Sequence, residues 1–262
     1  GRFVAFWSDS SNLVGNDTNA AFDIFVRDLE RKTTKLVSVG SAGGSADASS
    51  YLPSISADGR FVAFESIATN LVPNDTNALR DVFVRDLRER RTKRHSLSSA
   101  GIQANGDSRD AAISDDGRFV AFTSSATNLV GTDTNGNNDI FIRDRGTRTT
   151  RLISVSSTGV LANSGNYDPS VSADGRFVAF MSPASNLVGT DTNAQQDIFV
   201  RDRLQHTTKR VSVSSAGAEA NGGSTGPSIS DSGRLVAFYS GATNLVGNDT
   251  NNNDDIFVRG PA

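Results

Sequence analysis

Short apolar runs alternate with polar turns along the whole chain. The run RFVAF begins at residues 2, 60, 118 and 176, and RLVAF begins at 234, so neighbouring copies are always 58 residues apart. Periods of this order are typical of propellers and solenoids, in which each unit covers the apolar face of its neighbour. The pattern therefore predicts a single domain over residues 1–262, built from five repeats of 58 residues.

Each repeat predicts four short strands. In the second repeat these are PSIS (53–56), RFVAF (60–64), DVFVRD (81–86) and TKRHSLS (92–98), separated by clusters of Gly, Asp, Asn and Ser. No segment has apolar residues at helical spacing over ten residues. Four strands per unit is the blade composition of a β-propeller. We expect an all-β propeller with five visible blades, of which the first lacks its first strand and the last lacks its fourth.

Phenylalanine and Asp-Gly pairs recur at fixed places in the repeat. Of the 15 phenylalanines, 14 fall at the positions of Phe3, Phe6 and Phe25 or their equivalents, and Leu235 replaces phenylalanine in the last copy. Packing between blades is the expected role of these rings. The segment ADGR (57–60) and its copies join the first strand to the second, and Asp-Gly predicts a tight hairpin turn rather than carboxylate catalysis.

The number of strands suggests where the parent chain was cut. Five full periods need 28 residues more than the 262 present, which is the length of a fourth strand, a turn and a first strand. The chain opens on a second strand and closes on RGPA (259–262), where Gly-Pro suits a strand stop. We expect a truncated N-terminus. Two alternatives stay open, namely further blades upstream, or bare blade edges that join neighbouring molecules into an assembly.

Composition excludes several function classes. The formal net charge is −3 and no basic patch is visible, which argues against a nucleic-acid partner. The longest strongly apolar runs span four residues, far fewer than the ~20 of a membrane-spanning helix. Because the chain has no cysteine, it has no disulfide framework and no thiolate metal site.

One polar motif follows the second strand of each repeat. Residues 14–28 read VGNDTNAAFDIFVRD, and four more copies keep two aspartates and one asparagine at the same spacing. Oxygen ligands on alternate residues, followed by a carboxylate four residues later, suit a hard cation such as calcium. The candidate calcium ligands are Asp17, Asn19, Asp23, Asp75, Asn77, Asp81, Asp133, Asn135, Asp139, Asp191, Asn193, Asp197, Asp249, Asn251 and Asp255.

A second interpretation of this motif needs no ion. Asp and Asn side chains accept hydrogen bonds from backbone N–H groups two residues on, so DTN can form an Asx turn. Two carboxylates so close would still repel each other unless a positive group lies nearby. The candidate positive groups are the arginines of the VRD motif, Arg27, Arg85, Arg143, Arg201 and Arg259. The sequence leaves both interpretations open.

Catalytic motifs are absent from the sequence. His95 and His206 lie at or near fourth strands and have no equivalents in other copies, and there is no GxSxG elbow, phosphate loop or HExxH motif. We therefore expect a chain that is not an enzyme. Positions that vary between matched blades form the candidate ligand or partner surface. Its residues are Trp7, Tyr51, Arg109, Tyr167 and Tyr239, whose aromatic rings also suit a carbohydrate-binding or carbohydrate-active propeller.

The repeat resembles a known family. The pattern PSISADGRFVAFxS, DIFVRDL and TTKLVSV is similar to the TolB-like β-propeller repeats of bacteria, especially to a subgroup of exported proteins with NLVxxDTNxxxDIFVRD in each blade. The resemblance covers the whole chain and implies an extracellular or periplasmic location. It implies a non-catalytic scaffold or binding module with a protein or carbohydrate partner, although such propellers occasionally serve as enzyme domains.

Overall fold

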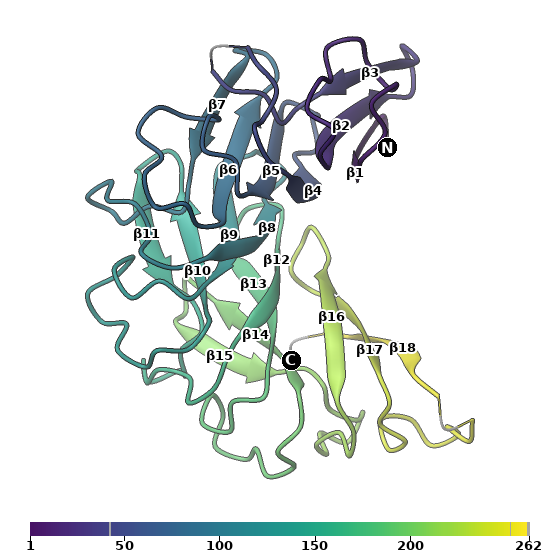
Figure 1. Cartoon of the computed structure of the whole chain (residues 1–262). Helices are drawn as coiled ribbons and strands as arrows, with labels where there is room; N and C mark the ends of the chain where they lie inside the picture. The colour runs from purple at the N-terminus through teal and green to yellow at the C-terminus, as the bar shows by residue number, and fades with distance from the viewer. Residues whose placement is uncertain (42, 252, 261–262) are drawn as a thin grey trace.

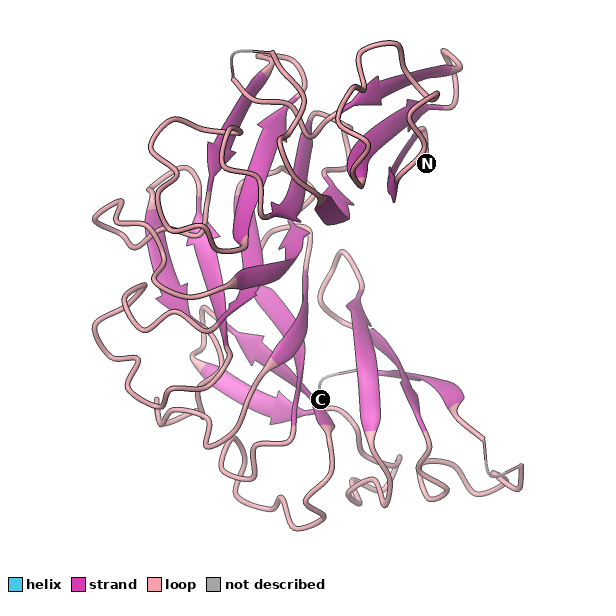
Figure 2. Cartoon of the chain, in the orientation of Figure 1, coloured by secondary structure: helices cyan, strands magenta, loops and turns pink. Residues whose placement is uncertain are grey.

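The strands form five antiparallel sheets. The computed structural model describes residues 1–41, 43–251 and 253–260, and within these ranges it contains strands and loops but no helix (Figure 2). The three middle sheets have four strands each, and the first and last have three. The predicted all-β propeller is thereby confirmed, including the blades that lack one strand. Residues 261–262, at the end of the RGPA segment, lie outside the described residues.

The strands of each blade follow one another along the chain, and each pairs with its neighbour in sequence. The bounds are β1 (Phe3–Ser8), β2 (Asp23–Asp28) and β3 (Thr33–Leu36) in the first blade; β4 (Ser50–Ile55), β5 (Phe61–Ser66), β6 (Asp81–Asp86) and β7 (Arg91–Arg94) in the second; β8 (Ser108–Ile113), β9 (Phe119–Ser124), β10 (Asp139–Asp144) and β11 (Thr149–Leu152) in the third; β12 (Tyr167–Val171), β13 (Phe177–Ser182), β14 (Asp197–Asp202) and β15 (Thr207–Arg210) in the fourth; and β16 (Ser224–Ile229), β17 (Val236–Ser240) and β18 (Asp255–Arg259) in the fifth.

In the second blade the first and fourth strands differ most from the prediction. In the second blade the first strand starts at Ser50 rather than residue 53, because a bulge between Tyr51 and Ser54 lets the strand continue past a register shift. Leu52 sits in this bulge with φ of +49°. The fourth strand ends at Arg94 rather than residue 98, because the chain turns away after its four paired residues.

The blades stand side by side along an arc (Figure 1). The first strands β4, β8, β12 and β16 contact one another in sequence order along the inner side of this arc. The fourth strands β7, β11 and β15 lie on its outer side (Figure 1). Each inner strand also packs against the second strand of the preceding blade, as β8 does against β5.

The apolar core lies mainly between blades. Val82 and Val84 of the second blade belong to one buried cluster with Ile113 and Phe122 of the third, and similar clusters join the other neighbouring blades. Inside each blade the phenylalanines of the second and third strands stack, with ring centroids 5.6 to 5.9 Å apart. Burial of these faces removes apolar surface from water and is the main stabilising contribution.

The Asp-Gly turn packs against the preceding blade. Asp116 accepts hydrogen bonds from the Ser114 hydroxyl at 2.6 Å and the Arg118 N–H at 2.8 Å, as expected for a tight turn. Gly117 has φ of +69°, and a Cβ there would lie 2.2 Å from Cδ2 of Phe61 in the neighbouring blade. Glycine is therefore required both by backbone conformation and by the close contact between blades.

Replacing this glycine tests the contact between blades. We expect Gly117→Ala to lower the free energy of unfolding by about 3 kcal/mol, because it combines a left-handed backbone with overpacking. Gly131→Ala is the matched control, since a Cβ at Gly131 meets no atom within 4 Å. Urea unfolding curves of both variants measure the difference. Equal losses in the two variants would contradict this account of the core.

Candidate functional site

The asparagine of the DTN motif holds its loop in an Asx turn. Asn19 Oδ1 accepts the N–H of Ala21 at 3.1 Å, and Asn19 Nδ2 donates to the carbonyl of Ala46 at 2.8 Å. Both contacts recur at Asn77, Asn135 and Asn193. The asparagine thus ties the DTN loop to the loop that follows the fourth strand.

The second aspartate of the motif is anchored by a serine. Asp23 begins β2 and is fully buried, and its Oδ1 accepts a hydrogen bond from the Ser38 hydroxyl. The Ser38 oxygen in turn accepts the N–H of Ile24 at 3.0 Å. The same serine–carboxylate contact joins Ser96 to Asp81, Ser154 to Asp139 and Ser212 to Asp197. One oxygen of each of these carboxylates is therefore committed to the fold.

In the second blade an arginine separates the two carboxylates. Arg94 Nη1 lies 3.0 Å from Asp75 Oδ1 and 2.9 Å from Asp81 Oδ2, and all three side chains are almost fully buried. The antiparallel register pairs Arg94 with Phe83, two residues from Asp81. Residues two apart on a strand share a face, so the end of β7 delivers this guanidinium to the loop.

The fourth blade repeats the arrangement. Arg210 at the end of β15 lies 3.6 Å from Asp191 and 3.2 Å from Asp197, and it also pairs with Glu219. Burial and the charge of Asp197 raise the pKa of Asp191 to about 6. Oxygens of Asp191, Asp197 and Glu219 lie within 4.8 Å of one another, a spacing that could hold a metal ion. The guanidinium of Arg210 already lies among them.

The VRD arginines do not neutralise these loops in the first four blades, so that interpretation is wrong there. Arg85 Nη1 donates to the Thr92 hydroxyl at 3.0 Å and to the Val39 carbonyl of the preceding blade at 3.3 Å. Arg27, Arg143 and Arg201 make the equivalent threonine contact. Each VRD arginine lies four residues beyond the second aspartate, so ~13 Å of extended strand separates them.

The first and third blades carry leucine where the second and fourth carry arginine. Leu36 and Leu152 are the equivalents of Arg94 and Arg210, and this alternation is readable from the aligned repeats. In the third blade burial and the charge of Asp133 raise the pKa of Asp139 to about 6. The sequence therefore contained the signal that separates two kinds of loop, although the role of these four positions was missed.

Removal of the arginine tests its role. We expect Arg94→Leu, in buffer with excess chelator, to lower the free energy of unfolding by about 3 kcal/mol, because two buried carboxylates lose their positive partner. Arg91→Leu, on the exposed start of β7, is the control and should change stability by less than about 0.5 kcal/mol. Urea titrations followed by circular dichroism measure both. A loss no larger than in the control would show that Arg94 does not stabilise the loop.

The candidate ligand surface lies at one level of the inner strands. Tyr51, Arg109 and Tyr167 occupy the same register position on β4, β8 and β12. Trp7 and Tyr239 lie at equivalent positions on β1 and β17, and Tyr239 pairs across the sheet with Thr225 at this level. The two are 46% and 44% exposed. The five side chains therefore share a level and come from five successive blades.

These side chains and their counterparts contact residues of the same or the neighbouring blade. The Tyr51 ring lies 5.5 Å from the ring of Phe22, and the Arg109 guanidinium lies 5.8 Å from the ring of Tyr167. Glu65, the second-blade counterpart of Trp7, is buried and accepts hydrogen bonds from Arg80 at 2.6 Å and from the Asp110 N–H at 2.8 Å. Burial raises the pKa of Glu65. Ligand binding at this level stays a prediction.

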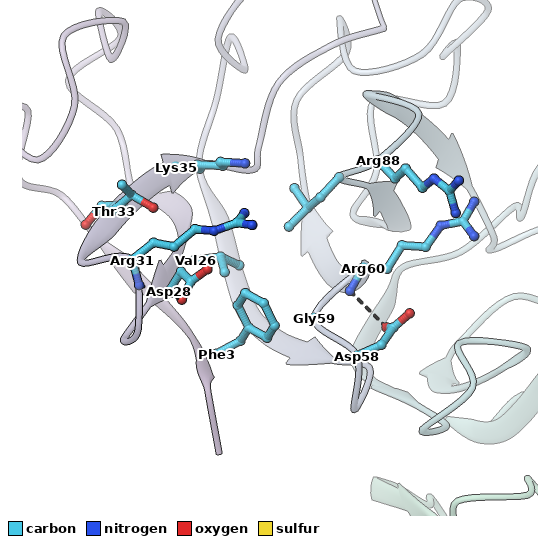
Figure 3. Close-up of a pocket in the computed structure, with 12 residues that line it drawn as sticks. Phe3, Val26, Asp28, Arg31, Thr33, Lys35, Asp58, Gly59, Arg60 and Arg88 are labelled. Carbon is cyan, nitrogen blue, oxygen red and sulfur yellow. Dashed lines mark hydrogen bonds between the residues drawn. The ribbon is translucent and has the colours of Figure 1, made fainter.

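A cavity of 610 Å³ lies between the first two blades. The ring of Phe3 faces it, with Arg31 and Lys35 on one side and Arg88 on the other (Figure 3). At the next two junctions the matching ring, Phe61 or Phe119, is covered by an arginine, Arg145 at 4.1 Å and Arg203 at 4.5 Å from the ring centroid. Leu87 takes that place here, and the guanidinium over the Phe3 ring is that of Arg2 from the same blade, at 4.8 Å from the ring centroid.

The histidines form no catalytic constellation in the described residues. His95 is buried, neither ring nitrogen has a hydrogen-bond partner, and burial lowers its pKa well below the usual value. A neutral, unpartnered imidazole cannot activate a nucleophile without a group in contact with it. His206 lies in the exposed turn before β15 with φ of +56°.

Solved structures with the same architecture are numerous, whereas no protein-family model and no curated protein sequence matches the chain. TolB from Acinetobacter baumannii is 20% identical, with a TM-score of 0.53 over 93% of this chain and 50% of that one. The fold is that of a TolB-like β-propeller. This TolB-like chain spans about half the length of that TolB and 61% of TolB from Agrobacterium tumefaciens.

Enzyme-associated propellers have the same fold. The β-propeller domain of the Trilobed protease from Pyrococcus furiosus is 12% identical, with a TM-score of 0.56 over 100% of the TolB-like chain and 66% of that domain. An oligogalacturonate lyase in complex with manganese is also 12% identical, with a TM-score of 0.52 over 91% of this chain and 54% of the lyase. Identities this low establish the fold alone. The described residues contain no helix long and apolar enough to span a membrane.

Proposed function

We propose that this chain is a non-catalytic β-propeller scaffold or binding module. The binding surface consists of Tyr51, Arg109 and Tyr167 on inner strands and of Trp7 and Tyr239 on second strands, and calcium stabilises loops of the DTN motif. The location is extracellular or periplasmic, as the resemblance to exported TolB-like repeats implies. A protein is the favoured partner, because the five side chains come from five different blades and so form a broad surface.

One observation carries the proposal, namely that the repeated charged groups hold each of the first four blades together. Arg118 pairs with Asp144 at 2.8 Å and lies over the ring of Phe119. The Asp144 carboxylate also accepts the N–H groups of Gly146 and Thr147. Its pKa is held well below the usual range by the Arg118 guanidinium. A carboxylate with such partners is a poor proton donor or acceptor at neutral pH.

Turnover assays test the absence of catalysis. We expect the purified chain to cleave neither fluorogenic peptides nor oligogalacturonate faster than a protein-free control, because its histidines and repeated carboxylates lack the partners that acid–base or nucleophilic catalysis needs. Peptide fluorescence and the absorbance of unsaturated oligogalacturonate products measure the rates. Turnover that increases linearly with protein concentration and stays with the chain through two purification steps would refute the proposal.

A second candidate role is that of a subunit in an assembly joined through the last blade. Ile256 and Val258 of β18 are 72% and 62% exposed, whereas the equivalent Ile24 and Val26 are buried at 0% and 3% because the next blade covers them. An apolar sheet face of this kind is typical of a surface that packs against another chain. A second copy of the chain is the simplest partner for it.

The mass of the chain in solution tests this second role. We expect a multimeric mass for the unsubstituted chain and a monomeric mass for Ile256→Lys, because the lysine places a charge in the apolar contact. Leu204→Lys is the control, since Leu204 is as exposed as Ile256 but lies in the turn between β14 and β15. Light scattering after size-exclusion chromatography measures the masses. A monomeric unsubstituted chain at 50 to 100 µM (roughly the range in which weak contacts form) would exclude the assembly.

A further inference from the structure

The loops of the DTN motif in the first four blades fall into two classes. In the second and fourth blades the fourth strand ends in arginine, Arg94 or Arg210, and the guanidinium lies between the two aspartates of the motif. In the first and third blades the same position is Leu36 or Leu152. Every other feature of the motif is retained, including both aspartates and the asparagine.

The leucine loops leave unpaired the same oxygens that the arginine occupies elsewhere. Arg94 binds Oδ1 of Asp75 and Oδ2 of Asp81. In the third blade the matching atoms, Oδ1 of Asp133 and Oδ2 of Asp139, are buried and have no hydrogen-bond partner among the described residues. Asp133 is 6% exposed and Asp139 is 0% exposed.

In the first blade the matching carboxylate oxygens also lack hydrogen-bond partners. Oδ1 of Asp17 and Oδ2 of Asp23 are buried without a hydrogen-bond partner in the described part of the chain. Asp17 is 9% exposed and Asp23 is 0% exposed. An ionised carboxylate that is buried without a partner is strongly unfavourable, and a second carboxylate beside it adds repulsion. Each leucine loop therefore lacks one positive charge that its arginine-containing counterpart has.

We propose that a calcium ion binds between Asp17 and Asp23 and another between Asp133 and Asp139, in the place that arginine takes in the second and fourth blades. This inference rests on the calcium-stabilised loops of the proposed function and assigns them to two blades. In these two blades the ion, like the arginine, connects the loop to the start of the third strand.

The arginine loops indicate which further oxygen would complete each site. Arg94 Nη2 donates to the carbonyl of Asn74 at 3.1 Å, and Arg210 Nη2 donates to the carbonyl of Thr190 at 3.0 Å. The equivalent carbonyls in the leucine loops belong to Asn16 and Thr132. Carboxylate and carbonyl oxygens are the ligands that calcium prefers, and its flexible coordination accepts water at the remaining positions.

In the third blade a cavity of 380 Å³ is lined by Leu152 and by Thr132, the residue before Asp133. In the fourth blade Glu219 adds a third carboxylate, but Arg210 lies among the three acidic side chains. We therefore assign no ion to the fourth blade, although it has the most acidic groups.

Exchange of the two side chains tests the assignment. The probe is calcium chloride, titrated by calorimetry into the chelator-treated, desalted full chain. Leu36→Arg and Leu152→Arg should each remove one bound calcium per chain, because the new guanidinium occupies the site. Leu36→Met and Leu152→Met are the matched controls and should keep the full number. Circular dichroism shows whether each variant is folded, and the natural Arg94 shows that a blade accommodates arginine here.

The reverse exchange provides an independent measurement. Arg94→Leu should add one bound calcium per chain, because Asp75 and Asp81 then resemble Asp133 and Asp139. An unchanged number of calcium ions in folded Leu152→Arg would overturn the assignment. No binding by the unsubstituted chain at millimolar calcium would also overturn it and would show that the carboxylates share protons instead. Neither result affects the turnover test, so failure of the calcium sites and failure of the non-catalytic role are distinguishable.

Discussion

Close packing of each blade on the next is the constraint on which the rest of the structure depends. Apolar side chains cover both faces of the middle sheets, so one blade alone would leave half of them in water. The turn at Gly117 shows how tight the contact is, because the backbone approaches the ring of Phe61 too closely for a Cβ. An insertion within the strands that flank this turn would shift it away from its partner ring. The constant period of 58 residues gives every repeat the same turn at the same place.

The DTN loops depend on this frame for their chemistry. The blades bury the start of the third strand, and with it the carboxylates of Asp23 and its equivalents. A buried pair of carboxylates requires a positive partner, and the chain supplies one from the end of the fourth strand in only two blades. An internal guanidinium or a bound ion can each supply the positive charge that the buried carboxylate pair needs. Their alternation along the arc would make parts of one propeller sensitive to calcium and leave the others insensitive.

Function in such a fold resides in the positions that differ between blades. The repeated Arg–Asp pairs and serine–carboxylate contacts are structural in every blade that has them, so they offer no unique reactive centre. Differences concentrate on the inner strands, where tyrosine, arginine and threonine replace one another at Tyr51, Arg109, Tyr167 and Thr225. The cavity at Phe3 is a second such difference, since Leu87 there replaces the arginine that covers the ring of Phe61 at the next junction. Propellers associated with proteases and with a lyase have the same fold. That similarity assigns no function to these particular residues.

The sequence by itself determined the repeat, the four-stranded blades, the Asp-Gly turns and the Asx turn, because each depends on residues close together in the chain. It also placed the two aspartates of every loop near each other. Only the tertiary structure decided which positive group meets them. Arg94 reaches Asp81 across the sheet through the register of β6 and β7, whereas Arg85, nearer in sequence, points to the preceding blade. Proximity along the chain cannot reveal which face of a strand a side chain shares with a residue on the next strand, since that depends on pairing and on the direction in which each side chain leaves the sheet.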